Sequence, residues 1–129
     1  MELTSNIISI AIENRFNFII NKINLLRNDN TFDEILNNNN SRTKLDLYKY
    51  YKQAKVGDCY VEQPSTENID EYRKWSSWNE AKNVNKIDAM TSYINIYELY
   101  LARINEIRIN QLENKIELLL NANTSNIIL

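Results

Sequence analysis

Apolar residues recur at helical spacing through most of the chain, and the first clear stripe runs from residue 16 to residue 26. Its members lie three or four residues apart, which places their side chains on one face of an α-helix. The stripe comprises Phe16, Ile19, Ile20, Ile23 and Leu26. We therefore predict an amphipathic helix here whose apolar face belongs to the core.

Three more helices are predicted downstream, over residues 45–56, residues 70–82 and from residue 85 to at least residue 104. Gly57 is a plausible stop for the first of them, because glycine accepts the left-handed conformation that commonly follows a last helical turn. Asn83 is predicted to close the next helix in the same way, since asparagine tolerates that conformation. The expected fold class is all-α.

The connection over residues 28–43 is rich in asparagine, which favours turns over packing. We predict an extended surface loop. An alternative is a short helical turn that touches the core through Phe32, Ile35 and Leu36.

Both ends of the chain carry apolar residues outside the four helices. No basic residue precedes the run that begins at Ile7, so a secretory peptide is not expected, and no stretch approaches the roughly 18–20 apolar residues of a spanning helix. Near the C-terminus Ile109, Leu112, Ile116 and Leu119 renew the helical period. Exposed, they would form an association surface. The interpretation we favour is that they pack back against Ile7, Ile8 and Ile12.

Length, charge and composition exclude most enzyme classes. The 129 residues suit one domain, and the net charge of −2 provides no general attraction to nucleic acid or to an anionic membrane. No histidine is present, and there is one cysteine and one glycine, so His-dependent nucleophiles, His/Cys zinc sites and glycine-rich phosphate loops are excluded. The prediction is a binding protein without catalysis, metal or cofactor. Cys59 cannot form an intramolecular disulfide, which fits a reducing, cytoplasmic compartment.

One stretch, residues 46–58, concentrates rings and cations. On a helix Tyr48, Tyr51, Lys52 and Lys55 share one face, because they lie at i, i+3, i+4 and i+7. Lys49 falls away from that face. Two phenols beside two ammonium groups suit a flat ligand with several negative charges, although such tyrosines are also common in cores and such lysines on solvated surfaces.

Together with three blocks downstream, this stretch resembles the acyl-CoA-binding protein family. Residues 48–58 read YKYYKQAKVGD, residues 62–64 read EQP, residues 74–80 read KWSSWNE and residues 88–94 read DAMTSYI, each at the family's separation from the last. The resemblance covers roughly residues 16–106. It implies a four-helix bundle, here with an extended first loop, an N-terminal extension over residues 1–15 and a C-terminal helical extension over residues 107–129.

The resemblance also implies a function and a ligand site. The expected ligand is a long-chain fatty acyl-CoA, bound reversibly by an intracellular carrier or pool former. The alternative is a helical protein-interaction module that uses the C-terminal apolar stripe, with a vestigial ligand site. The nucleotide phosphate is expected at Lys52 and Lys74, and the adenine against Tyr48 or Tyr51.

Other ligand contacts carry over from the family by position. Trp75 is expected near the ligand and Tyr93 is expected to reach it, while Phe16 and Ile20 would line the acyl-chain groove. The family often has a basic residue near the end of the first helix, but the matching position here is Asn24.

Overall fold

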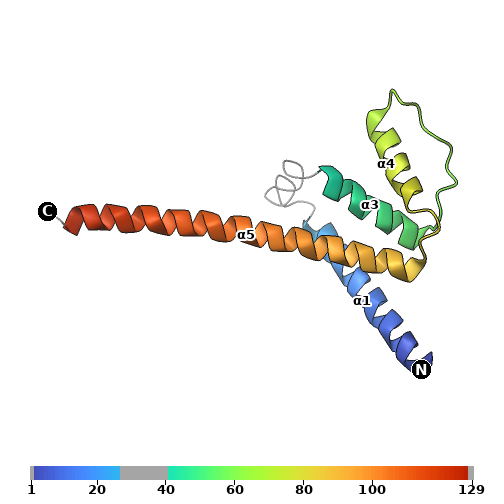
Figure 1. Ribbon diagram of the computed structural model, residues 1–129, viewed down its shortest axis with the longest axis horizontal. Helices are drawn as coiled ribbons and strands as arrows, with labels where there is room; N and C mark the ends of the chain where they lie inside the picture. Colours follow the sequence, from blue (N-terminus) through green and yellow to red (C-terminus); the bar gives the residue numbers. More distant parts are fainter. Residues whose placement is uncertain (1, 27–40, 128–129) are drawn as a thin grey trace. The chain divides into compact units, whose positions relative to one another are not determined.

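A computed structural model describes residues 2–26 and 41–127 of the chain. Within these ranges the secondary structure is helical, without a strand (Figure 1), which confirms the all-α prediction. The helices are α1 (Glu2–Leu26), α3 (Ser41–Lys55), α4 (Ile69–Glu80) and α5 (Lys86–Ile127). The asparagine-rich connection, with Phe32, Ile35 and Leu36, lies almost entirely outside the described residues.

The chain divides into two compact units, residues 1–98 and residues 99–129. The first unit contains α1, α3, α4 and the beginning of α5, and the second contains the rest of α5. Helix α1 begins much earlier than the stripe that predicted it. No proline or glycine interrupts residues 2–15, so nothing in this segment breaks the helix before Phe16.

The core of the first unit joins α1 to α5. Phe16 and Ile19 of α1 are fully buried, as the stripe predicted, and Met90, Tyr93 and Tyr97 of α5 are buried too. The rings of Phe16 and Tyr93 meet edge to face, with centroids 5.1 Å apart and an interplanar angle of 75°. This arrangement is the one that aromatic quadrupoles favour.

Gly57 and Asn83 both take the left-handed conformation that was predicted for them, but only Gly57 follows its helix closely, because α4 ends at Glu80 with Ala81 as its C-cap and Asn83 lies in the turn beyond. Gly57 has φ 97° and Asn83 has φ 73°. The carboxylate of Asp58 links the two turns, because its Oδ1 accepts hydrogen bonds of 2.8 Å from the Asn83 backbone N–H and from Gln53 Nε2. These two hydrogen bonds, the one from Asn83 above all, hold the pKa of Asp58 below its usual value.

The two tryptophans of α4 fasten the connection between α3 and α4. Trp78 Nε1 donates a hydrogen bond of 2.8 Å to the carbonyl of Gly57, and Trp75 Nε1 donates one of the same length to the carbonyl of Val61. The next helix, α5, begins at a side-chain cap, since Asn85 Oδ1 accepts from the Asp88 backbone N–H at 2.8 Å. Such a cap satisfies an amide that the first turn leaves unpaired.

The second unit is a helical segment with large apolar side chains in solvent. Ile109, Leu112, Ile116 and Leu119 are all about half exposed, and so are Ile7 and Ile8 in the first unit. Across residues 2–26 and 41–127, none of the helices combines the length and apolar character needed to cross a membrane.

Candidate ligand-binding site

Helices α3 and α4 pack against each other, and two sets of side chains meet across their contact. We call the first set the aromatic side, made of Tyr48, Lys52, Lys74 and Trp78. We call the second set the ion-paired side, made of Arg42, Asp46, Lys49, Ser77 and Glu80. Spacings of three and four residues within each helix keep the members of each set on one stripe.

On the aromatic side each helix presents one cation to a ring of the other. Lys74 Nζ of α4 lies 5.9 Å from the centre of the Tyr48 ring, and Lys52 Nζ of α3 lies 4.8 Å from the centre of the Trp78 ring. Both distances fall within the range of cation–π attraction. Because a ring face holds an ammonium without neutralising it, the charge and N–H donors of Lys52 stay able to meet an anion.

The environment of Tyr48 is partly desolvated. Burial raises the pKa of its phenol, and the nearby carboxylate of Glu71 raises it further. Glu71 also lies 4.0 Å from Lys74 Nζ, but both side chains are about half exposed, so the pair is weak. Tyr48 is therefore a neutral ring between solvent and the helix contact, which suits stacking.

The rest of the predicted α3 face is directed toward α1 and α5. Lys55 Nζ lies 5.7 Å from the centre of the Phe16 ring. Burial raises the pKa of Tyr93 to about 12, and the phenols of Tyr51 and Tyr97 add to the shift, so Tyr51 lies near Tyr93. Tyr51 itself is 37% exposed. One side of α3 thus reaches α4 and the other reaches the α1–α5 core.

The predicted ligand residues fall into two groups in the structure. Tyr51 and Lys74 are exposed, while Tyr48, Lys52, Trp75 and Ile20 are half-buried. Phe16 and Tyr93 are core residues, with 0% and 5% of their surfaces exposed. In the structure Lys74 lies over the ring of Tyr48, and the rings of Phe16 and Tyr93 are in contact. Lys52 lies over the ring of Trp78.

Trp78 is the member of this cluster that is absent from the predicted ligand residues. It is buried, and it also supplies the ring beneath Lys52. No local spacing indicates this pairing, because the two residues come from different helices. Only the packing of α4 on α3 brings them together.

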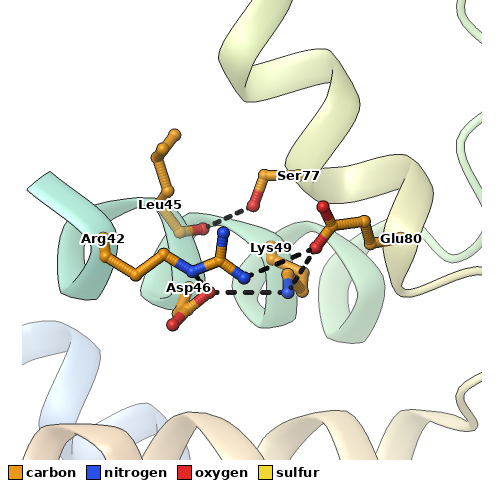
Figure 2. A network of polar contacts seen from close by, with 6 residues as sticks. All are labelled: Arg42, Leu45, Asp46, Lys49, Ser77 and Glu80. Carbon is orange, nitrogen blue, oxygen red and sulfur yellow. Dashed lines mark hydrogen bonds and ion pairs between the residues drawn. The ribbon is translucent and has the colours of Figure 1, made fainter.

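The ion-paired side is a closed network (Figure 2). Lys49 Nζ lies 2.9 Å from Glu80 Oε2 and 3.4 Å from Asp46 Oδ1. Arg42 joins the same two carboxylates at 3.8 Å and 3.3 Å. Neither cation meets Asp46 Oδ1 in hydrogen-bond geometry, so these two contacts are ion pairs only. Beside them Ser77 Oγ donates to the carbonyl of Leu45 at 2.9 Å.

Lys49 is more than a solvated lysine off the ligand face. It is buried, which by itself lowers the pKa of the ammonium, but the hydrogen bond to Glu80 and the charges of Glu80 and Asp46 outweigh burial and raise it. In turn the hydrogen bond from Lys49 keeps the pKa of Glu80 below its usual value. Lys49 therefore stabilises the α3–α4 contact, and a substitution there is expected to change folding as well as charge.

A cavity of about 500 Å³ lies at the end of α3. Its lining includes Gln53, Lys55, Asp58, Val84 and Lys86. Neither Lys52 nor Lys74 lines it. We place the candidate site at the aromatic side because two cation–ring pairs meet there across the α3–α4 contact, and an anionic nucleotide requires both cations and rings.

Comparison with known proteins gives a consistent family signal. The family model described as "Acyl CoA binding protein" matches residues 13–97. The acyl-CoA-binding domain-containing protein 6 homolog of Dictyostelium discoideum is 39% identical over 85 residues, which is 66% of this chain and 27% of that protein. The diazepam-binding inhibitor-like 5 of Rattus norvegicus is 34% identical over 68 residues, covering 53% of this chain and 70% of the relative.

A solved structure supports the same likeness. The crystal structure of Oryza sativa acyl-CoA-binding protein 2 aligns with a TM-score of 0.61 and 25% sequence identity, covering 74% of this chain and 96% of that one. The chain matches only about a quarter of the length of the Dictyostelium domain-containing relative.

Proposed function

The chain belongs to the acyl-CoA-binding protein family, and from this premise we propose that it binds long-chain acyl-CoA esters reversibly, as an intracellular carrier and pool former. The matched segment, residues 13–97, contains every residue predicted to touch the ligand. The comparisons lend no support to the alternative of an interaction module with a vestigial site.

The pair of cations on the aromatic side is the observation that carries this proposal. Lys52 and Lys74 come from different helices, and each lies over a ring. A nucleotide 3′-phosphate needs such cations, and adenine can stack on the exposed phenol of Tyr51 or on Tyr48. We propose that Trp75 lies beside the bound nucleotide and that Tyr93 donates to the ligand from the core.

The acyl chain would occupy an apolar groove that includes Ile20, with Phe16 beneath it. Each buried methylene contributes about 0.8 kcal/mol, so a chain of roughly 14–16 carbons could contribute on the order of 10 kcal/mol. Association costs of about 4–15 kcal/mol offset much of this gain. Binding is then tight and still reversible, as a carrier requires.

We propose that binding is the whole activity, that the binding domain spans residues 16–106 and that the protein works in the cytoplasm. The absence of histidine and the single cysteine argue against a nucleophile with a general base. Cys59 is a free, buried thiol, which suits a reducing compartment.

Calorimetry with free CoA, acyl-CoA of several chain lengths and free fatty acid tests the proposal. We expect saturable binding of acyl-CoA, with affinity that rises with chain length, and little binding of the fatty acid, which lacks the nucleotide. No heat of binding with any of the three, from a protein that is helical by circular dichroism, would contradict it.

Lys52→Ala then tests the nucleotide end. We expect affinity for acyl-CoA to fall by about 1.5–3 kcal/mol, or roughly 10- to 150-fold, because the phosphate loses a charged hydrogen bond. The loss should be equal for short and long chains and should shrink as salt screens the charge. Lys82→Ala is the matched control, since Lys82 Nζ also lies over a ring, that of Tyr60 at 5.9 Å. If the two variants lowered affinity equally, the phosphate would not bind at Lys52.

A further inference from the structure

Four exposed apolar residues in the second unit follow a heptad pattern. Ile109, Leu112, Ile116 and Leu119 are separated by three, four and three residues, and between 46% and 58% of each residue's surface is exposed. This alternation is the a and d spacing of a coiled coil. The helix is continuous across it, because α5 runs to Ile127.

The residue types at these positions specify a particular assembly. Both a positions, 109 and 116, are isoleucine, and both d positions, 112 and 119, are leucine. A β-branched residue at a with leucine at d favours two parallel strands over three or four. The partner that fits these positions is therefore the same segment of a second copy of the chain.

The stripe does not continue the buried face of the same unit. Ile104 is buried, with 3% of its surface exposed, and Ile109 follows it after five residues. At about 100° per residue, five residues turn an α-helix by roughly 140° beyond a full turn. The heptad stripe thus lies on a different face of the helix from Ile104.

Charge supports the parallel orientation. Arg108 falls at position g before the first a residue, and Glu113 falls at the following e position. In a parallel pair g of one helix meets e of the next heptad on the other, so Arg108 faces Glu113 twice across the dimer. In an antiparallel pair that buries the same stripe, Ile109 would face Leu119 and Leu112 would face Ile116, which brings Lys115 against Lys115 and Glu113 against Glu113.

We propose that residues 108–119 form a parallel two-stranded coiled coil with the same residues of a second copy, so that the protein is a homodimer joined through α5. The interface is short, and the dimer is accordingly weak and dependent on concentration. This inference rests on the second unit and does not depend on acyl-CoA binding.

Sedimentation of the full-length chain tests the dimer. We expect the mean mass of the wild type to rise from monomer toward dimer over roughly a hundredfold range of concentration. Leu112→Asp should weaken dimerisation at least about tenfold, because it places a carboxylate in the apolar seam. Asn114→Asp is the matched control, since it adds the same charge at the exposed f position and should leave the mass unchanged.

A charge exchange tests both the pairing and the orientation. Arg108→Glu and Glu113→Lys should each weaken the homodimer by roughly two- to fivefold, whereas a mixture of the two variants should form heterodimers, because each then offers the charge that the other lacks. A wild type that stays monomeric up to about 0.5 mM would overturn the proposal. So would a Leu112→Asp variant whose unfolding free energy falls without any change in mass, since the stripe would then pack within its own chain.

Discussion

The two sides of the α3–α4 contact hold their lysines in different ways. On the ion-paired side Lys49 is buried and lies 2.9 Å from a carboxylate oxygen of Glu80. On the aromatic side Lys52 lies over the ring of Trp78, and no carboxylate among the described residues forms an ion pair with it. A carboxylate neutralises an ammonium and a ring does not. Of these two lysines only Lys52 therefore retains its positive charge, and this is the charge that we propose meets a ligand phosphate.

Because of this difference, Lys49 and Lys52 have different roles although they lie three residues apart on α3. Lys49 stabilises the packing of α3 on α4, and we propose that Lys52 binds the ligand. Changes on the ion-paired side should therefore alter folding, and loss of the Lys52 cation should alter binding. Trp78 is the exception on the aromatic side, because it is also a core residue.

Trp78→Ala should have the largest effect on stability. We expect the free energy of unfolding to fall by about 3–5 kcal/mol, since a buried indole leaves a cavity. The hydrogen bond from Trp78 to Gly57 is also lost. Urea denaturation followed by circular dichroism measures the change. Trp75→Ala is the control, because Trp75 is only half-buried, and it should cost clearly less. Equal losses of unfolding free energy in the two variants would show that the buried Trp78 ring does not support the aromatic side more than Trp75 does.

Much of this architecture can be predicted from the sequence. Helical periodicity and turn chemistry are local properties, so they predict α3, α4 and the start of α5 to within a few residues, and they predict the left-handed conformations of Gly57 and Asn83. They do not predict the start of α1, because its first residues lack a clear apolar stripe although nothing in them breaks a helix.

The distinction between Lys49 and Lys52 could not be predicted. Both lie in the same run of rings and cations, and the partner that closes off Lys49 is Glu80, on another helix. The same limit applies to Phe16. Helical spacing shows that it faces inward, but whether inward means a sealed core or an acyl groove depends on how α5 covers it.

Lys49→Met should have an intermediate effect, and it should act on folding. Methionine keeps much of the length of the side chain but removes the ammonium, so Asp46 and Glu80 lose their shared cation. We expect the free energy of unfolding to fall by about 1–2 kcal/mol, less than for a fully buried pair because Glu80 is half exposed. Acyl-CoA affinity of the folded protein should stay within about twofold of wild type. A weakened affinity with unchanged stability would reverse the roles of the two lysines.

The smallest predicted effect is on the free energy of unfolding at acidic pH. Because Lys49 lowers the pKa of Glu80 in the folded state, ionised Glu80 contributes stability that is fully present above the unfolded value near 4.5 and is lost as the pH falls through the lower folded value. Glu80 is half exposed, so this contribution should be below about 1 kcal/mol.

Urea denaturation at several pH values between about 6 and 3 tests this prediction. The free energy of unfolding should fall more steeply with pH for wild type than for Lys49→Met. Asp58 serves as an internal reference, because its pKa is lowered by Asn83 and Gln53 and its contribution should persist in the variant. Parallel profiles for the two proteins would mean that the Lys49–Glu80 pair does not hold the ion-paired side together.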